Sequence, residues 1–533
     1  MTSTTETGYS LTSISLPPQV RCSGLSHRAW RSPRATNAAL LVSAVLLSLV
    51  AAVLGVHNIK YGIGFVLCLG LVCAVLARPV VGGLVLIAAV PPLSGLEPGL
   101  ITPNVRLSEA LIGIIGLTVI LGTRRVAAVK WGLLEWLLLA YGLLWALLAA
   151  YDAISLGQTL SLSTWGSVIG QLQFFLLYRT VRLTLRTPRQ RRLGLVVLIV
   201  VTVPVALVAI MQEAGVGGLR TSLADITGNT SPIGMSGIIR ATGPFGNWAA
   251  LAGYFLPILM ALIALGLGGQ LKRWPRTSIA LGALMLIGIL LTAELSVIIC
   301  LIGGVFVLAV QYGRLGKMMV WFAVAAALAV IVVGPVLGNR LTTQFGNVAG
   351  SSKSTLEPQT VSFRTDVWTQ QYLPAVAQRP LEGYGLVLPK TISWPYPESQ
   401  YIALLIDGGY PLLIMYLCLL WGAFDQARRA SRARDPVEQA VGRSLAVCIV
   451  SLLLLGITWP FVSNGGLPQV LWCLFALCGT VGNRFTHGEP ALVDTTSSDS
   501  LTTKKNKVLS TATTARERWT KPYRWAVLSR NAG

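Results

Sequence analysis

The segment Ser362-Phe363-Arg364-Thr365-Asp366-Val367-Trp368 lies in a polar stretch of the chain that is enclosed by long apolar runs. Three further polar motifs follow it: Arg379-Pro380-Leu381-Glu382-Gly383-Tyr384-Gly385, Pro397-Glu398-Ser399-Gln400-Tyr401 and Asp407-Gly408-Gly409. Hydrophobic residues make up 53% of the 533 residues, so this density of charged and turn-forming residues marks a part of the chain that meets water. We call residues 339–398 the polar island.

The apolar runs on either side of the polar island predict membrane helices. A bilayer core requires about 20 mostly apolar residues per helix. The predicted fold is therefore all-α, a polytopic transmembrane helical bundle of about 12–14 spans with one large external loop. The predicted spans are residues 38–55, 61–77, 79–95, 107–122, 131–151, 161–178, 193–212, 247–268, 277–292, 295–311, 318–338, 399–423, 444–462 and 467–483.

The charge distribution predicts the topology. The net charge of +22 suggests nucleic acid in a soluble protein, but here Arg and Lys concentrate in alternate loops, as the positive-inside rule describes. Both termini are predicted to be cytoplasmic, and no nucleic-acid partner is expected. The predicted domains are an N-terminal arm (1–37), helices 1–11 (38–338), the external polar island (339–398), helices 12–14 (399–483) and a disordered basic cytoplasmic tail (484–533).

Four charged residues are predicted to face the same side of the membrane: Arg240, Glu294, Arg364 and Glu398. Arg240 begins the glycine-rich turn Arg240-Ala241-Thr242-Gly243-Pro244-Phe245-Gly246-Asn247, which leads into a helix. Backbone amides at a helix N-terminus, together with a guanidinium, can bind phosphate oxygens. The alternative is an arginine that sets topology beside a turn that only caps the helix.

Within the polar island, Arg364, Trp368 and Gln371 recur at helical spacing and are predicted to share one helix face. The alternative is a solvated helix that lies on the membrane surface. Glu398 precedes a predicted span, where a carboxylate is either a catalytic group or a helix cap favoured by the macrodipole. Trp368, Trp394 and Tyr401 could line a sugar site, although interfacial aromatic belts are the commoner explanation.

These motifs, in this order, resemble the O-antigen ligase and O-antigen polymerase superfamily over residues 190–480. The resemblance rests on Arg240 to Asn247, on Arg364 to Trp368, on Pro380 to Gly385 and on the polar motif before Tyr401. It implies a GT-C-like membrane glycosyltransferase of the bacterial plasma membrane, with no metal and no cofactor. The implied donor is a glycan on undecaprenyl pyrophosphate, and the implied partners are a glycan acceptor, membrane lipids, a flippase and a chain-length regulator.

The resemblance also implies roles for individual residues. Arg240, Arg364 and Glu398 are the predicted catalytic residues, and the two arginines match those that hold the pyrophosphate. The predicted substrate-binding residues are Asn247, Glu294, Trp368, Gln371 and Tyr401. Ligases commonly carry a His near position 399, whereas His27, His57 and His487 all lie outside the polar island, so an acid–base role passes to Glu398 or is dispensable.

The missing histidine favours polymerisation of a surface polysaccharide or exopolysaccharide over ligation to a lipid or protein acceptor. Two other interpretations stay open. A transporter or lipid flippase also has many helices and a basic cavity, although such proteins often carry charges near the membrane midplane and repeated halves. A membrane scaffold without catalysis is the second.

Overall fold

The computed structural model describes residues 59–97, 105–122, 131–157, 166, 168, 170–228, 240–316, 359–462 and 465–478. Over these residues the chain is helical and contains no β-strand. The predicted spans at 38–55 and 318–338, the arm at 1–37, the first part of the polar island and the tail at 484–533 lie outside the described residues.

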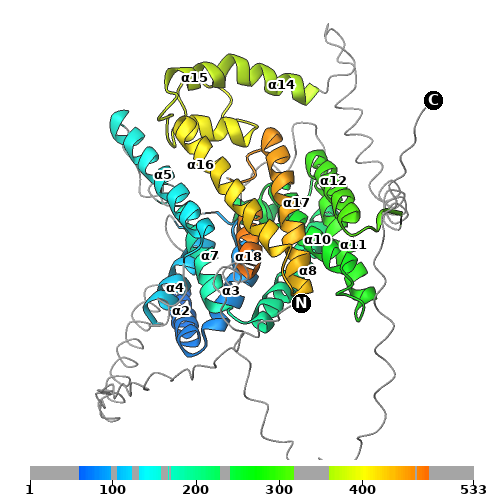
Figure 1. Cartoon of the computed structure of the whole chain (residues 1–533). Coiled ribbons are helices and arrows are strands. Elements are labelled where there is room, and N and C mark those ends of the chain that lie inside the picture. Colours follow the sequence, from blue (N-terminus) through cyan, green and yellow to red (C-terminus); the bar gives the residue numbers. More distant parts are fainter. Residues whose placement is uncertain are drawn as a thin grey trace, which may run out of the picture. The chain divides into compact units, whose positions relative to one another are not determined.

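Figure 1 shows the described helices, coloured in the order of the chain. The first part of the chain forms α2 (Ile59–Ala77), α3 (Pro79–Leu93), α4 (Leu107–Gly122), α5 (Leu133–Ser155), α7 (Leu172–Thr184), α8 (Pro188–Glu213), η2 (Val216–Gly218) and α9 (Leu219–Thr227). The second part forms η3 (Gly243–Phe245), α10 (Trp248–Leu267), α11 (Pro275–Leu291), α12 (Leu295–Gln311), α14 (Gln359–Val367), η4 (Trp368–Tyr372), α15 (Leu373–Gln378), α16 (Gln400–Ala430), α17 (Pro436–Thr458) and α18 (Leu467–Cys478).

Five described helices are long and apolar enough to cross a membrane: α5, α8, α10, α16 and α17. Six shorter apolar helices accompany them, in α2, α3, α4, α11, α12 and α18. The protein is thus an all-α polytopic membrane protein, as predicted. Helix α10 forms the centre of the bundle, because it is apolar on every side and packs against α11, α12, α17 and α18.

Several helix boundaries differ from the sequence prediction, and in two of them the physical reason can be identified. Helix α17 begins at Pro436, well before the predicted start at 444, because the Asp435 side chain accepts a hydrogen bond from the Val437 amide and proline suits the first helical position. Of the span predicted at 161–178, the described helix α7 begins at Leu172 and continues past the predicted end to Thr184. Its basic end is helical because Arg179 and Arg182 are buried against Glu135 rather than solvated in a loop.

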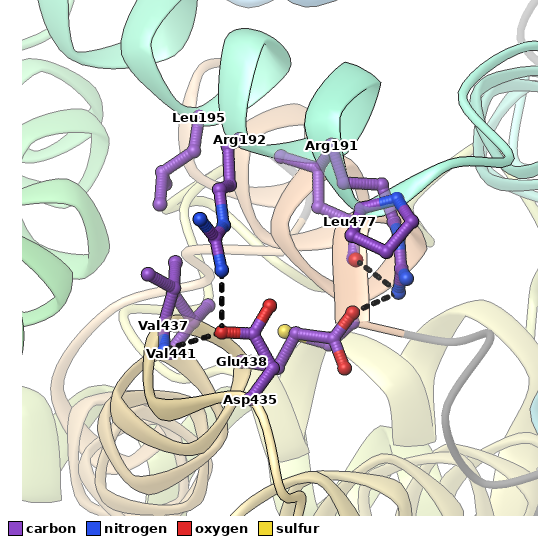
Figure 2. A pocket seen from close by; sticks show the side chains of 10 residues that line it. Arg191, Arg192, Leu195, Asp435, Val437, Glu438, Val441 and Leu477 are labelled. Atoms are coloured by element: carbon purple, nitrogen blue, oxygen red, sulfur yellow. Dashed lines mark hydrogen bonds and ion pairs between the residues drawn. The ribbon is translucent and has the colours of Figure 1, made fainter. Parts of the chain in front are cut away.

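These buried charges are paired between helices. Each oxygen of the Glu135 carboxylate lies 2.7 Å from one of the guanidinium groups of Arg179 and Arg182. Arg191 of α8 pairs with Glu438 of α17, and the neighbouring Arg192 lies 3.0 Å from Asp435 (Figure 2). A pocket between these two helices is lined by both pairs, but by none of the predicted site residues. We assign these charges to structure, since a buried charge requires a partner.

Helix α16 is interrupted at Gly408 and Gly409, and the turn at 380–385 packs against the interruption. Gly409 has φ 64° and ψ −164°, a conformation that essentially only glycine adopts. The Tyr410 amide donates to the Pro380 carbonyl at 2.8 Å, and the Tyr384 amide donates to the Ile406 carbonyl at 2.7 Å. The polar island is thereby hydrogen-bonded to a membrane helix.

The same turn is held to α5 by an ion pair. Arg379 Nη2 lies 2.9 Å from Oδ1 of Asp152, whose side chain is fully buried. Gly383 and Gly385 both have positive φ, a conformation that glycine adopts readily in turns. Together these contacts give the last part of the polar island a defined position on the bundle.

Candidate active site

The polar island contributes a helical segment with one irregular turn. Helix α14 is followed by the π-helical turn η4 and then by α15, which has Pro374 in its first turn. Proline lacks an amide hydrogen and its ring crowds the carbonyl four residues earlier, so a widened turn before it avoids the clash. Pro374 therefore accounts for the irregular turn.

One face of this helical segment holds the extended residues 393–398. The Trp368 indole donates to the Pro397 carbonyl at 2.7 Å, and Gln371 Oε1 accepts from the amides of Ser393 and Trp394 at 2.9 and 3.2 Å. Arg364, from the same face, reaches Glu398. The predicted common face of Arg364, Trp368 and Gln371 is confirmed. The substrate-binding roles of Trp368 and Gln371 stay predictions, because both side chains have protein partners here.

Arg364 and Glu398 form a partly buried ion pair. Nε and Nη2 of Arg364 donate to Oε2 of Glu398 at 3.3 and 3.2 Å. Glu398 has φ 54°, unusual for a residue with a side chain, and this conformation directs its carboxylate to α14. Ser399, not Glu398, stands at the N-cap of α16, and its hydroxyl donates to the Gly456 carbonyl at 3.0 Å. The alternative that Glu398 serves as a helix cap is therefore not observed.

The environment of Glu398 favours its neutral form. Burial raises the pKa of the Glu398 carboxyl, and Glu294 raises it further, whereas the charge and hydrogen bonds of Arg364 and a contact with Trp394 oppose this shift. The net direction is upward. A carboxyl with a raised pKa at a partly exposed position is suited to proton transfer near neutral pH.

The beginning of α16 is tied to the end of α17. The Tyr401 hydroxyl donates to the Leu453 carbonyl at 2.6 Å, and Gln400 Oε1 accepts from the Val462 amide at 2.9 Å. Tyr401 thus has a structural partner, and its predicted substrate-binding role stays a prediction.

The turn that carries Arg240 is held by a side chain that the sequence reasoning missed. Gln212 of α8 is buried and accepts from the amides of Thr242 and Gly243 at 2.9 and 2.8 Å, and its own amide donates to the Thr242 hydroxyl at 2.8 Å. The only sequence signal was a polar residue near the end of an apolar run. At the other end of the turn, Asn247 caps α10 by accepting from the amides of Ala249 and Ala250.

This arrangement changes the predicted phosphate receptor. The sequence predicted that backbone amides of this turn bind phosphate oxygens. In the structure, side chains accept hydrogen bonds from four of them, namely the amides of Thr242, Gly243, Ala249 and Ala250. The cap role of Asn247 follows from N-terminal preference for asparagine. Any anion binding at this turn must therefore depend on Arg240 itself.

The Arg240 side chain is buried, and one of its nitrogen donors has no hydrogen-bond partner among the described residues. The residue is only 7% exposed, its guanidinium lies 4.7 Å from the centre of the Trp248 ring, and its Nε has no hydrogen-bond partner among the described residues. Burial lowers the pKa of Arg240, and the charge of Glu294 opposes that shift. A buried guanidinium with a donor that lacks a partner is a candidate for binding an anion.

Glu294 connects the two halves of the site. It stands at the N-cap of α12 and accepts a hydrogen bond from the Ser296 hydroxyl at 2.7 Å. Its charge acts on both Arg240 and Glu398, and Coulomb interactions weaken with distance, so Glu294 lies within range of both. Glu294 is therefore coupled by charge to Arg240 and to Glu398, which pairs with Arg364, and we call these four residues the charged cluster.

No metal site accompanies this cluster in the described part of the chain, where no three His, Cys, Asp or Glu side chains are grouped so that they could hold an ion. The predicted absence of a metal and a cofactor stays a prediction.

Comparison with known proteins adds one match. No curated protein matches the chain significantly. Residues 280–417 match the model of a family described as O-Antigen ligase, and this segment includes Glu294, Arg364 and Glu398 of the cluster. This match supports the resemblance to the O-antigen ligase and polymerase superfamily over residues 280–417.

Proposed function

We propose that this protein is a glycosyltransferase that acts on undecaprenyl-pyrophosphate-linked glycans at the outer leaflet of the bacterial plasma membrane. Polymerisation of repeat units is the preferred reaction. The family match supports an O-antigen ligase-like membrane enzyme, and the donor class, the leaflet and polymerisation belong to this proposal. The observation that carries it is the buried Arg240, whose Nε has no hydrogen-bond partner among the described residues and whose charge interacts with that of Glu294.

The proposed reaction is an inverting displacement. An acceptor hydroxyl attacks the anomeric carbon of the donor, the bond from that carbon to the pyrophosphate oxygen breaks, and its electron pair leaves with the pyrophosphate. Arg240 stabilises the charge that develops there, and such preorganised donors contribute most in a dry site. Arg364 contributes a second positive charge near the leaving group and orients Glu398.

Glu398 takes the proton of the attacking hydroxyl. Burial raises the pKa of Glu398, which makes its carboxylate a stronger base than that of an exposed glutamate. Glu294 supports this role, because its negative charge raises the proton affinity of Glu398 and also compensates the buried charge of Arg240. Each residue thus has a distinct electrostatic role.

The first test is complementation of a strain that lacks the gene. Wild type, Arg240→Ala, Arg364→Ala and Glu398→Gln are expressed at matched membrane levels, and surface polysaccharide length is profiled on gels. Lys390→Ala is the matched control, because it removes an exposed cation from the same segment without a role in the cluster. Single repeat units without long chains in the three variants are the expected result.

Other outcomes separate the remaining candidates. If the variants make polysaccharide of normal length that remains attached to the lipid carrier, the protein is a ligase. Wild-type profiles in all three variants contradict the proposal and favour transport. One observation supports that alternative: α16 is interrupted at Gly408 and Gly409, and broken membrane helices are frequent in transporters.

A further inference from the structure

Three aromatic rings next to the charged cluster form a connected row that the proposed reaction does not use. Phe363 and Trp394 meet edge to face with ring centroids 5.3 Å apart, and Trp394 and Tyr396 meet in the same way at 5.8 Å. Phe363 is 40% exposed and Tyr396 is 57% exposed, so both ends of the row are accessible. We call Phe363, Trp394 and Tyr396 the aromatic row.

The backbone that carries the aromatic row is fixed by hydrogen bonds. Gln371 accepts from the amides of Ser393 and Trp394, and the Tyr372 hydroxyl donates to the Trp394 carbonyl at 2.8 Å. Tyr396 is flanked by Pro395 and Pro397, which restrict the backbone on both sides. Rings held in this way can bind a ligand with little loss of conformational entropy.

The aromatic row directly adjoins the ion pair of the candidate site. Phe363 immediately precedes Arg364 in α14, and Tyr396 lies two positions before Glu398. Trp394 also lowers the pKa of the Glu398 carboxyl, although its indole nitrogen makes no hydrogen bond among the described residues. A molecule that packs on the row therefore also lies next to the proposed catalytic carboxyl.

The surroundings of the row favour a sugar over a lipid. Thr365, Asp366, Thr369 and Ser393 are exposed on the same helical segment and loop. The apolar side chains of α14 are not gathered on one face, whereas a helix that lies in a membrane surface carries a continuous apolar face. Asp366 also repels the anionic headgroups that retain such helices.

Pyranose rings match this chemistry. The axial C–H bonds of a pyranose form an apolar face that packs on an aromatic ring, while its hydroxyl groups need polar partners around the edge. The row supplies exposed ring faces, and the neighbouring hydroxyl and carboxylate groups supply the polar edge. We propose that the aromatic row is a glycan-binding subsite, which holds sugar units of a substrate next to the reacting bond.

The proposal rests on the proposed function for the identity of the glycan, and binding can be measured without turnover. The probe is a set of oligosaccharides made by partial acid hydrolysis of the strain's own surface polysaccharide. Binding to the full-length protein in lipid nanodiscs is measured by saturation-transfer difference NMR. Tyr396→Ala and Phe363→Ala are expected to weaken the Kd about three- to tenfold, as loss of one aromatic contact does.

Matched variants separate stacking from general disturbance. Tyr396→Phe keeps the ring and is expected to retain binding within about twofold. Val387→Ala removes a side chain that is 45% exposed on the same segment but outside the row, and its Kd should equal that of wild type. An unchanged Kd in both Tyr396→Ala and Phe363→Ala overturns the proposal.

Two further measurements test the subsite independently of the proposed catalytic activity. Arg240→Ala removes the proposed catalytic charge but leaves the row intact, so retained oligosaccharide binding in that variant supports the subsite even where transfer fails for all substrates. A nitroxide at Tyr396→Cys, with every cysteine except the buried Cys300, Cys448, Cys473 and Cys478 replaced by alanine, reports the surroundings of the row. Relaxation by a water-soluble nickel complex supports the subsite, whereas relaxation by oxygen alone places the row in lipid and overturns it.

Discussion

Arg364 donates two hydrogen bonds to one oxygen of Glu398 from a position 34 residues earlier in the chain. Both donors of the Arg364 guanidinium, Nε and Nη2, bind Oε2 of Glu398. Besides burial, the pKa of the Glu398 carboxyl is shifted by groups on three different segments, namely α14, the start of α12 and the loop that carries Trp394. The pH dependence of the enzyme should therefore respond to substitutions in all three.

The acid limb of the pH–rate profile should report Glu398. A general base acts when it is ionised, so activity falls as pH decreases through its pKa. Burial raises this pKa, so the loss should begin at a higher pH than for an ordinary glutamate with a pKa of about 4.3. Glu398→Gln should remove the limb and reduce the rate about 10²- to 10⁴-fold, measured on purified protein with lipid-linked substrate. A wild-type limb that persists in Glu398→Gln contradicts the assignment.

Glu294→Gln should move that limb to lower pH. Glu294 raises the pKa of Glu398, so its neutralisation makes Glu398 easier to ionise and extends activity into more acidic solution. The same assay over pH 4–8 measures the shift. Asp366→Asn neutralises another acidic residue of the polar island that has no effect on Glu398, and its profile should match that of wild type. A shift to higher pH in Glu294→Gln would show that Glu294 does not act through charge.

Arg240→Met should separate activity from stability. The replacement keeps a long apolar stem over Trp248 and removes a buried charge, whose desolvation opposes folding. We expect a thermal midpoint equal to or above that of wild type and a transfer rate at least about 100-fold lower, as for loss of one preorganised donor. Fluorescence-detected unfolding in detergent and the transfer assay check the two parts. A clear decrease in the midpoint would assign Arg240 to folding instead.

Gly409→Ala should destabilise the protein. A Cβ at Gly409 would lie 2.4 Å from the Pro380 carbonyl oxygen and 2.6 Å from the Leu381 carbonyl carbon, and the backbone conformation is itself unfavourable for alanine. We expect a loss of at least about 2 kcal/mol, seen as a lower thermal midpoint. Gly303→Ala is the control, because nothing lies within 4 Å of its added Cβ. Equal midpoints for the two variants would contradict the close packing at Pro380.

Local patterns predicted the parts of the structure that depend on neighbouring residues. The apolar runs at 247–268 and 295–311 match α10 and α12, and the spacing of Arg364, Trp368 and Gln371 correctly predicted a shared face. The hydrogen bond between Gln212 and Thr242 could not be predicted, because it joins α8 to a turn 30 residues away. The burial of Arg179 and Arg182 was missed for the same reason: their partner Glu135 lies on α5.

The hydrogen bonds between the turn at 380–385 and the interruption of α16 have an evolutionary consequence. Each part donates one backbone amide hydrogen bond to a carbonyl of the other part. A Cβ added at Gly383 or at Gly409 would lie too close to the main chain of the other part. A side chain added at one position therefore requires a displacement at the other. The two glycine motifs should be inherited and exchanged together among related proteins, and chimaeras that take them from different parents should fold poorly.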